Sequence, residues 1–562
     1  MRPAAAAATA AAAAAVLSAS TCSYAASTSG SALPAVLATT IPSSGRGYNN
    51  DNANNNDGVH SSPPRPSRAY PHGCSSQPPS YYDYENMSFP PEYLRANLVR
   101  SADEFGLTRR LGAGKFSDVF EGVDLVEERR MLKGGESGSN SDDQSADDCA
   151  THADLEVDPR TLVVIKCLKP VSDRKVRREL LVLTHASSLP NLARLRGVVI
   201  PDATTAATAG VKERADGTGT AGHIPSGGAA SVSSRARSAA TMPSLVLEHA
   251  GRQSRWLCHG RGTDSKQTTA TEDDDDEDSL YLSEYEIKYY LFHLLVGLDA
   301  LHSRGVMHRD VKPRNTLINR SATYPRRDGL GNSRSGLSSS SLSPQSASLA
   351  GERNSLMLVD LGLADFYLPG QRYNVRVASR HYKAPELLVG NEYYDYAVDL
   401  WGVGCILAGL LFRREPFFRG RDNVDQLAKI VPVLGPNDLT DYCRRVGIEL
   451  STELNAAVLK YSSRAGPNGS RRPWRDFVTG SCPEPGNDAL DLLDRLLVYD
   501  HLERYTAREA MAHSFFDDVR GRVKDEIRSR SRDRHAFSHT VQSTSSIRYG
   551  ARVNWRKYDA QM

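Results

Sequence analysis

The stretch 302–319, HSRGVMHRDVKPRNTLIN, holds three types of side chain that together could transfer a phosphoryl group. Asp310 offers a carboxylate that can orient a hydroxyl and accept its proton, Lys312 offers a charge for the moving phosphoryl, and Asn315 offers an amide oxygen for a metal ion. A polar loop after an amphipathic helix is the plain alternative. The short spacing from Asp310 to Asn315 favours the catalytic interpretation, because it places all three groups on one tight loop.

The elements around this loop supply a second pair of charges. The stretch Leu162–Leu168, LVVIKCL, is apolar and rich in β-branched residues, and it carries one charge, Lys166. A lysine inside an apolar strand is either an edge residue or a paired functional group. The helix predicted over Asp173–His185 offers Glu179 as a partner. We therefore expect an ion pair between Lys166 and Glu179, of the kind that positions nucleotide phosphates in phosphoryl transfer.

Two further stretches place groups that suit a nucleotide and its metal ion. Residues Phe105–Val123 predict a strand–turn–strand unit in which Gly112 and Gly114 let backbone amides approach phosphates closely. Because many hairpins contain such a glycine pair, this stretch gains its weight from the lysine-bearing strand that follows it. The apolar stretch Leu356–Leu363 predicts a strand that places Asp360 beside a glycine, where its carboxylate can reach a metal ion bound to the nucleotide.

Composition limits the other classes of function. The 562 residues carry a net charge of +2, so no global field indicates nucleic acid or a membrane surface as a partner. The eight cysteines are scattered without a Cys-x-x-Cys pair, which indicates a reducing compartment, and we expect the protein in the nucleus and cytoplasm. Only the Ala-rich stretch Met1–Ala26 is as long as a membrane span. A signal or transit peptide is the alternative there, but the nearly pure alanine favours low-complexity sequence.

Shifts in composition divide the chain. Residues 1–80 are low-complexity sequence, rich in Ser, Pro, Gly and Asn toward their end, and we expect them to be disordered. Residues 81–517 hold the predicted folded domain. Residues 518–562 form a basic tail, for which nucleic-acid binding or nuclear import is the alternative to a merely solvated segment. Five polar stretches interrupt the domain at expected surface connections and are predicted to be disordered insertions. They cover residues 132–158, 201–240, 251–278, 320–354 and 462–472.

Longer stretches carry a resemblance to a known family. They are YYDYE at 81–85, LGAGKFSDVFEG at 111–122, VVIKCLKPV at 163–171, YNVRVASRHYKAPELL at 373–388, FRREPFFRGRDNVDQL at 412–427 and YDHLERYTAREAMAH at 499–513. Together with the loop around Asp310, they resemble the eukaryotic protein kinases and, within them, the catalytic alpha subunits of casein kinase II. The resemblance spans most of the predicted domain, but neither terminus nor the insertions.

The resemblance implies a fold and a reaction. The implied fold is the two-lobed α+β kinase fold, with a docked segment at 81–104, a small β-rich N-terminal lobe at 105–250 and a larger, mainly helical C-terminal lobe at 279–517. The implied reaction transfers the γ-phosphate of ATP, with Mg²⁺, to Ser or Thr in acidic protein substrates. GTP as a second donor and a regulatory beta subunit as a partner are left open. The resemblance also implies activity without phosphorylation of the activation loop, which the segment at 81–85 props in its active form.

The resemblance also assigns roles to individual residues. The implied catalytic residues are Asp310, Lys312, Lys166 and Glu179, and the implied metal ligands are Asn315 and Asp360. The implied nucleotide-binding residues are Leu111, Gly112, Ala113, Gly114, Lys115, Phe116, Ser117, Asp118, Val119, Lys166, Glu248 and Ala250. Leu247 and Leu361 depart from the family pattern, which commonly has phenylalanine at both positions.

Charge patterning favours acidic substrates independently. Two basic clusters lie on elements expected to border the cleft, one on the helix that carries Glu179 and one in the loop after Asp360. They comprise Arg174, Lys175, Arg177 and Arg178, and Arg376, Arg380 and Lys383. Together they would focus a positive potential where a peptide docks. A solvated face is the alternative for each cluster.

Two other functions remain open on the sequence alone. The first is a pseudokinase, a catalytically inactive scaffold whose insertions bind partners. Such proteins usually lack at least one of the chemical residues Lys166, Glu179, Asp310, Asn315 and Asp360, which are all present here. The second is a proline-directed kinase of the same broader group. Lys383 in YKAPE, and the absence of a Thr-x-Tyr pair over 360–386, argue against it.

Overall fold

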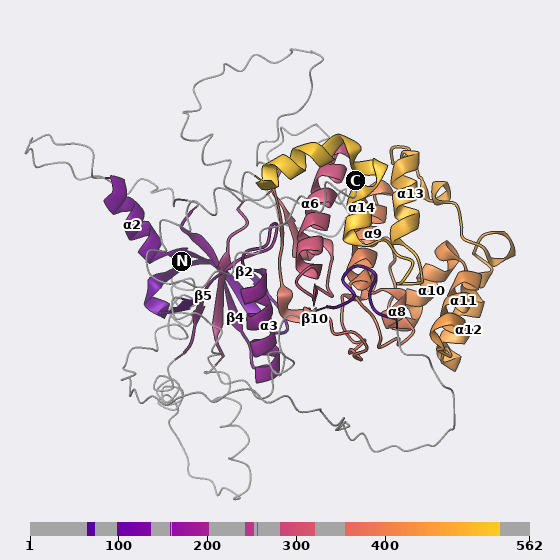
Figure 1. Ribbon diagram of the computed structural model, residues 1–562, viewed down its shortest axis with the longest axis horizontal. Helices are drawn as coiled ribbons and strands as arrows, with labels where there is room; N and C mark the ends of the chain where they lie inside the picture. Colours follow the sequence, from indigo (N-terminus) through magenta and orange to yellow (C-terminus); the bar gives the residue numbers. More distant parts are fainter. Residues whose placement is uncertain are drawn as a thin grey trace, which may run out of the picture.

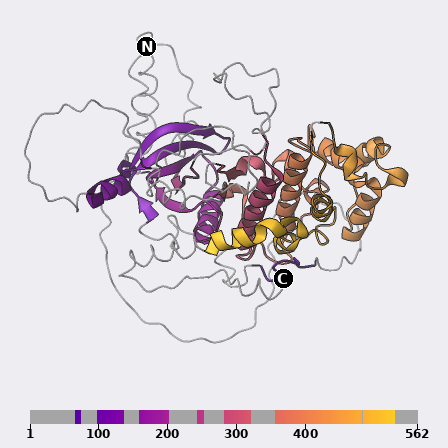
Figure 2. The same cartoon turned by 90° about the horizontal axis from the view of Figure 1, so that it is seen from above.

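The computed structural model of the protein describes residues 65–73, 98–135, 158, 160–201, 242–251, 256, 281–320, 355–480 and 482–528. In these residues, strands gather in an N-terminal lobe and helices in a larger C-terminal lobe (Figure 1). The view from above shows the same division, with the curved sheet on one side and the helices on the other (Figure 2). The predicted two-lobed α+β fold is confirmed.

The N-terminal lobe is built on a six-stranded sheet with the strand order β1-β5-β6-β4-β3-β2. All pairs are antiparallel except β1 with β5, which run parallel at one edge. The strands are β1 (Val99–Arg100), β2 (Phe105–Ala113), β3 (Ser117–Asp124), β4 (Leu162–Leu168), β5 (Leu195–Val199) and β6 (Ser244–Glu248).

Alternation along β4 sends its apolar and charged residues to opposite faces. Val163 and Ile165 are fully buried in a small core with Val246 of β6. Since successive side chains of a strand point to opposite faces, Lys166 lies on the other face, where it pairs in register with Val119 of β3. The predicted strand over these residues is confirmed with the same bounds.

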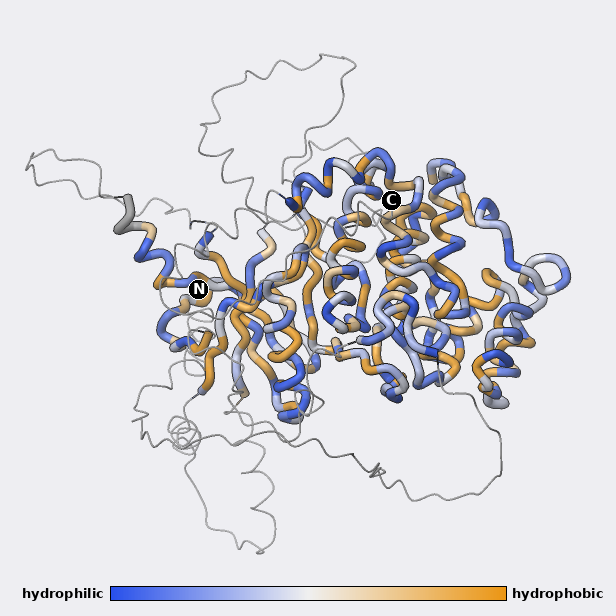
Figure 3. The backbone as a smooth tube through the Cα atoms, viewed as in Figure 1, coloured by the Kyte–Doolittle hydropathy of each residue, from blue (hydrophilic) through white to orange (hydrophobic). Residues whose placement is uncertain are grey.

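Two helices accompany the sheet. Helix α3 (Asp173–Ala186) buries Val176, Glu179 and Leu180 and packs on the 3-10 turn η7 (Leu361–Leu363) at the junction of the lobes. Helix α2 (Leu125–Gly135) projects from the sheet (Figure 1) and is mainly hydrophilic (Figure 3). It extends into the predicted insertion 132–158, so that insertion begins as helix rather than as a disordered loop.

The C-terminal lobe surrounds two central helices, α6 (Glu284–His302) and α9 (Ala397–Leu411). Every residue of α9 is buried, and both helices contribute to the main apolar core, whose segments appear orange in Figure 3. Within the part of the chain that the structure describes, no helix has the length and apolarity needed to cross a membrane. The other helices are α8 (Pro385–Leu388), α10 (Asn423–Leu434), α11 (Pro436–Val446), α12 (Thr452–Ser462), α13 (Asn487–Leu496) and α14 (Ala507–Ala512). The shorter 3-10 turns are η3 (Ala102–Glu104), η6 (Pro313–Asn315), η8 (Arg380–Tyr382), η9 (Pro467–Gly469), η10 (Trp474–Phe477) and η11 (Ser514–Phe516).

Short strands at the lobe junction carry the chemical residues. Strand β7 (Val306–Met307) pairs with β10 (Asp365–Phe366), and β8 (Thr316–Ile318) pairs with β9 (Leu356–Leu358), each antiparallel. The strand predicted over 356–363 ends at Leu358. Asp360 then adopts a left-handed backbone with φ of 65°, which a strand cannot continue.

A segment before the sheet has defined contacts on the C-terminal lobe. Residues 65–73 fall in the region predicted to be disordered, yet the backbone N–H of Ser67 donates to the Tyr367 hydroxyl at 2.8 Å. The Tyr70 hydroxyl donates to Asp299 at 2.7 Å, and its ring packs edge-on against Tyr396. A half-buried aromatic ring and a few hydrogen bonds hold this segment, and an average over a polar region conceals them. The segment YYDYE at 81–85 lies outside the described residues.

Two predicted insertions are also partly ordered. In 462–472, the backbone N–H of Arg472 donates to the carbonyl of Val433 at 3.0 Å, and Arg471 pairs with Asp494. In 251–278, the side chain of Trp256 is buried, and its indole N–H donates to the carbonyl of Thr316 at 2.6 Å. Each insertion contains a few side chains that the C-terminal lobe holds, and polar composition does not reveal them.

The basic tail begins as a packed helix rather than as a solvated segment. Residues 517–528 are helical and bury Val519, Val523 and Ile527. Their spacing of four places these residues on one helix face. The abundant charged residues hide this stripe when the tail is read by its composition. The helix lies across the upper end of α6 in Figure 1, where it is yellow.

Glu526 joins this helix to α6 and should contribute to stability. Burial alone would raise its pKa, but the nearby His293 imidazole at 3.6 Å and hydrogen bonds from Tyr289 and Arg522 outweigh burial and lower the pKa from 4.5 to about 2. We expect Glu526→Gln to reduce the free energy of unfolding by roughly 1–3 kcal/mol at neutral pH. The depressed pKa stabilises the fold above pH 4.5, and this contribution is lost as the pH falls toward 2. Thermal unfolding at pH 7 and pH 3 should therefore show a gap between wild type and variant that narrows at pH 3. The exposed Glu453→Gln on α12 serves as the control.

Candidate active site

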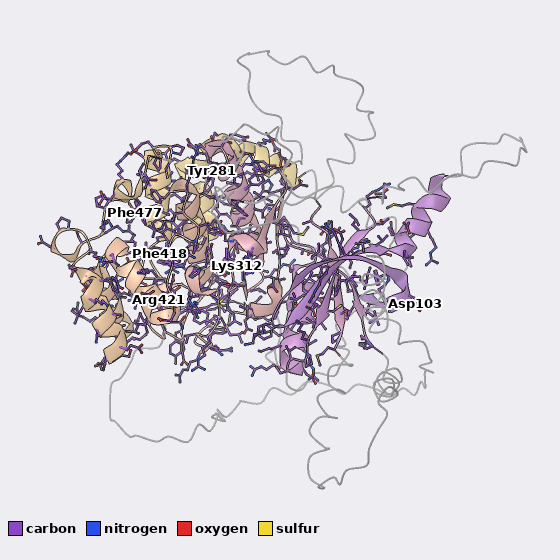
Figure 4. All side chains as sticks on the ribbon, turned by 180° about the vertical axis from the view of Figure 1, so that it is seen from behind. Asp103, Tyr281, Lys312, Phe418, Arg421 and Phe477 are labelled. Carbon is purple, nitrogen blue, oxygen red and sulfur yellow. The ribbon has the colours of Figure 1, made fainter. Side chains whose placement is uncertain are left out.

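The loop between β7 and β8 brings the three predicted chemical groups into contact. One carboxylate oxygen of Asp310 accepts hydrogen bonds from the Lys312 ammonium at 2.6 Å and the Asn315 amide at 3.0 Å. The other oxygen accepts from the backbone N–H of Ser379 at 2.8 Å. Lys312 also donates to the Ser379 hydroxyl at 2.7 Å. Asp310 is therefore held by its own loop and by the segment 360–386 that crosses it (Lys312 is labelled in Figure 4).

A buried aspartate from α9 fixes the backbone of this loop. Asp399 accepts hydrogen bonds from the backbone N–H groups of His308 at 2.8 Å and Arg309 at 2.7 Å, and from the His302 imidazole at 2.9 Å. Burial alone would raise the pKa of Asp399, but the contact with His302 and the hydrogen bonds outweigh burial and hold the pKa below its ordinary value. Asp399 therefore stays charged and keeps Arg309 in its left-handed conformation, with φ of 63°.

Lys166 bridges the two lobes. Its ammonium lies 2.7 Å from a carboxylate oxygen of Glu179 on α3 and 2.8 Å from one of Asp360. Gly362 allows this approach, because a Cβ there would lie 3.3 Å from oxygens of both Glu179 and Asp360. The predicted pairing of Lys166 with Glu179 is present, and Asp360 joins it.

Burial and charge act against each other in this triad. Burial alone would lower the pKa of Lys166 and raise that of Asp360. The two carboxylates outweigh burial at Lys166 and raise its pKa, while Lys166 holds the pKa of Asp360 below its ordinary value. The lysine is therefore positive and the aspartate negative at neutral pH, as phosphate and metal binding require.

Asp360 and Asn315 fit a magnesium ion by the chemistry of their oxygens. One oxygen of Asp360 accepts from Lys166, which leaves its second oxygen for a ligand. The Asn315 amide nitrogen donates to both the backbone carbonyl and the carboxylate of Asp310, so its amide oxygen faces away from them. Mg²⁺ prefers hard oxygen ligands and is commonly held by one or two protein oxygens together with nucleotide phosphates.

The glycine-rich turn between β2 and β3 is held by local contacts. The backbone N–H of Gly114 donates to the carbonyl of Ser117 at 2.8 Å, and Lys169 donates to the carbonyl of Gly114 at 2.8 Å. Lys115 and Lys175 both lie over the exposed ring of Phe116. The turn thus combines small residues with cations gathered around Phe116. The whole predicted nucleotide stretch Leu111–Val119 lies in this turn and its two strands.

The geometry can be compared with known families. Residues 266–516 match the family model of the protein kinase domain. This part of the chain is similar to a protein kinase domain. The match contains Asp310, Lys312, Asn315 and Asp360, and the sheet that carries Lys166 precedes it in the chain. The match supports kinase activity for this region, and a protein kinase domain in general implies ATP and Mg²⁺. The arrangement of its chemical residues does not favour the inactive-scaffold alternative.

The connection after β6 is the remaining predicted nucleotide contact of the kinase. The Glu248 carboxylate pairs with Arg194 at 3.1 Å, and its backbone N–H donates to the carbonyl of Arg194 at 2.9 Å. Ala250 is buried in a small apolar cluster with Ala193 and Met357. The side chain and the backbone N–H of Glu248 are thus both occupied within the protein.

The predicted substrate-binding cations fall into two groups. Arg174, Lys175, Arg376 and Arg380 are exposed, whereas Arg177 is half-buried and pairs with Asp173 at 3.7 Å. Arg178 turns inward and pairs with Asp365 at 3.1 Å. Lys383 is buried, and its ammonium donates to the carbonyl of Val375 at 3.2 Å. Burial lowers the pKa of Lys383. The structure therefore does not bring Arg178 and Lys383 to the surface as predicted, because each meets an internal acceptor.

Asp365 has a role that sequence analysis missed. Its carboxylate accepts from the Arg309 guanidinium at 2.9 Å and from Arg178 at 3.1 Å, so it connects the catalytic loop to α3. A second missed contact is the fully buried ion pair of Glu386 and Arg504, at 2.7 Å. It connects the end of the activation segment, residues 360–386, to the loop before α14. In the sequence, the only sign of this role for Asp365 is that a charged residue stands next to the apolar Phe366, which is buried. Arg504, 118 residues away from Glu386, offered none.

Proposed function

We propose that this kinase transfers the γ-phosphate of ATP to Ser or Thr residues in acidic sequence contexts and is active without phosphorylation of its activation segment. The phosphoryl transfer follows from the kinase domain and its geometry. The choice of acceptor and of sequence context is the proposal, and the family resemblance to casein kinase II alpha subunits agrees with it.

One observation carries the acidic preference. Ser379 donates its backbone N–H to the catalytic Asp310, and the next residue, Arg380, is exposed. A second exposed arginine, Arg376, precedes it, and Ala378 between them has a left-handed backbone with φ of 63°. The segment that touches the catalytic carboxylate thus also presents two cations. A carboxylate a few residues from the acceptor would lie near them and gain a charge-assisted contact.

The chain's own residues divide the chemistry in a simple way. Asp310 orients the acceptor hydroxyl and takes its proton, and Lys312, bonded to the same carboxylate, supplies positive charge beside it. Lys166, fixed by Glu179, balances charge on the nucleotide phosphates. Asp360 and Asn315 would hold Mg²⁺, which neutralises phosphate charge when bound.

Internal contacts support independence from activation-segment phosphorylation. In many kinases a phosphate on this segment orders the site by pairing with an arginine. Here the Arg309 guanidinium is already bonded to Asp365, to the carbonyl of Leu363 at 2.8 Å and to the Tyr394 hydroxyl at 3.1 Å. Arg309 is 3% exposed, so the carboxylate of Asp365 takes the place that a phosphate would occupy.

The acidic preference predicts a selective loss in a charge-reversal variant. We expect Arg376→Glu with Arg380→Glu to raise KM for a Ser peptide with acids one to four residues after the acceptor by roughly tenfold or more. KM for a matched neutral peptide should stay unchanged. Because both arginines are exposed, added salt should weaken the preference of the wild type. Steady-state kinetics on acidic, neutral, Pro-directed and Tyr peptides measures this. Equal KM values for acidic and neutral peptides in the wild type would refute the proposed context.

Independence from phosphorylation predicts a second outcome. Treatment with a broad phosphatase should leave kcat of the purified kinase unchanged, as checked by mass spectrometry of the segment 360–386. Asp365→Asn should instead lower kcat, because Arg309 and Arg178 lose their shared charge partner. A kinase that loses its turnover with phosphatase and regains it after rephosphorylation would contradict the proposal.

Partners and location extend the same proposal. We expect acidic proteins as substrates and a nuclear and cytoplasmic location. GTP can be compared with ATP as the phosphate donor in the same assay. Binding of a regulatory beta subunit, and of nucleic acid through the basic tail, stay predictions from the resemblance and the charge pattern. Pull-down with a beta subunit and fractionation of the native protein would check them.

A further inference from the structure

A row of exposed cations leads away from the activation segment. It starts beside Arg380 of that segment, and its first members are Arg419 and Arg421, on the loop before α10. The two stretches are joined at Gly420, whose carbonyl lies 3.2 Å from the imidazole of His381. Gln426, fully buried, completes the joint, because it accepts from the backbone N–H of Gly420 and donates to the carbonyl of His381.

Buried aromatic residues determine which way this loop faces. Phe417 and Phe418 are both buried, and Phe418 stacks on Trp401 of α9 with ring centroids 5.9 Å apart. The neighbouring Arg419 and Arg421 are exposed, with 84% of the Arg421 side chain accessible. Figure 4 shows Arg421 near Phe418, farther from the N-terminal lobe than Lys312. Packing of the phenylalanines therefore directs the arginines outward.

The row continues along one face of α10. Arg421, Asp425 and Lys429 follow one another at intervals of four residues, and both cations pair with Asp425, at 3.3 Å and 3.9 Å. Asp425 is the shared partner and is itself buried. A second acid nearby, Asp422, is exposed, and its side chain accepts from the backbone N–H of Asp425 to cap the helix. The acids in this row are thus used within the protein, while the two cations reach the surface.

The row ends in a cluster around Tyr461 on α12, which packs beside α10. Lys429, Lys460 and Arg464 lie 5.1, 5.8 and 5.1 Å from the centre of the same tyrosine ring. An aromatic ring attracts each cation, but three cations around one ring also repel one another. An anionic group between them would relieve that repulsion.

The dimensions of the row select an extended ligand. Lys429 on α10 lies eight positions after Arg421, which stands just before this helix, and eight residues at the helical rise correspond to about 12 Å. An extended peptide covers that distance with roughly four residues. A single carboxylate or phosphate cannot bridge the row, but a tract of acidic residues can contact it at several points.

We propose that this row, comprising Arg419, Arg421, Lys429, Lys460 and Arg464, binds acidic residues of the substrate that lie farther along the peptide from the phosphorylated residue than those received by Arg376 and Arg380. This inference rests on the proposed function, since Arg376 and Arg380 receive the acids close to the acceptor. The preferred substrate is then a long acidic tract, with its distal part read on α10 and α12.

Three peptides test the proposal. All share one Ser acceptor; the first is neutral, the second has acids at the four positions after the acceptor, and the third adds acids further along, after a short neutral spacer. We expect KM of the wild type to fall from the first peptide to the second and to fall again, roughly tenfold, from the second to the third. In Arg421→Gln with Lys429→Gln, the third peptide should lose its advantage over the second, while kcat stays the same.

Controls keep the outcomes separate. Lys460→Glu with Arg464→Glu provides a second variant that leaves the contacts of Asp425 intact, in case the first variant unfolds. Arg444→Glu, an exposed arginine on α11 paired with Asp441, is the matched control and should change neither KM. If the wild type does not distinguish the first two peptides, the proposed function is wrong. If it distinguishes them but treats the second and third alike, or if both row variants keep the advantage of the third, only this inference is overturned.

Discussion

Replacing Asp310 by asparagine should lower kcat by roughly two to four orders of magnitude, since a positioned general base contributes about that much. The carboxylate is the acceptor for Lys312, Asn315 and the backbone N–H of Ser379. Asparagine keeps the size of the side chain but replaces one acceptor oxygen by a donor amide. The variant can neither take the proton of the hydroxyl nor balance Lys312. Phosphate transfer to an acidic Ser peptide under single-turnover conditions measures the chemical step directly.

The control for this variant separates chemistry from folding. Asp476→Asn changes an exposed carboxylate of the C-terminal lobe and should leave kcat unchanged. Unfolding temperature and nucleotide affinity of Asp310→Asn should stay near wild type, because the loop backbone is held by Asp399 rather than by Asp310. Near-normal turnover in Asp310→Asn would refute the proposed mechanism. If Asp310→Asn loses both its fold and its activity, Asp310→Glu replaces it in the comparison with the wild type. Asp310→Glu keeps the charge but shifts the position of the carboxylate, so its kcat should be lower.

Lys166→Met should reduce kcat/KM for ATP by roughly a hundredfold or more, in the range found when one preorganised electrostatic contact to the reacting groups is removed. The change leaves Glu179 and Asp360 without the cation that lies 2.7 and 2.8 Å from them. Because Lys166 holds the pKa of Asp360 below its ordinary value, its removal should raise that pKa. Activity that remains should therefore begin to fall at a higher pH on acidification than in the wild type.

A matched lysine distinguishes this effect from a general loss of charge. Lys460→Met removes an exposed lysine from α12, far from the junction of the lobes, and should leave kcat/KM unchanged for a peptide with proximal acids only. The pH–rate profile and the ATP dependence of both variants can be measured side by side. Wild-type kcat/KM in Lys166→Met would show that the pair with Glu179 is structural.

Local pattern determined the elements that carry chemistry. The apolar, β-branched stretch LVVIKCL predicted the strand β4, and Lys166 stood out as its one charge. The strand has the predicted bounds. The helix predicted over 173–185 is α3, and the helix expected before the catalytic loop is α6, which is buried on nearly every side. These features depend on residues within a few positions of one another, so the sequence expresses them directly.

Composition was a poorer guide where few residues decide the outcome. Tyr70, Trp256 and the stripe Val519, Val523 and Ile527 anchor segments whose average polarity predicts disorder. A single buried aromatic ring or one apolar stripe can offset the entropy of ordering a short segment. Averages over a long window conceal such anchors.

Only the tertiary structure decided which of the predicted substrate-binding charges reach the surface. Arg178 and Lys383 are cations like Arg174 and Arg380, yet Asp365 and the carbonyl of Val375 draw them inward. The buried pair of Glu386 with Arg504, and the meeting of Lys429, Lys460 and Arg464 around Tyr461, likewise join residues distant in the chain. Partners of this kind are set by how helices and loops pack, and a cation in the sequence carries no mark of the acceptor it will meet. The sequence by itself determined the chemical groups and the elements that bear them, whereas packing decided which of those groups remain available to bind.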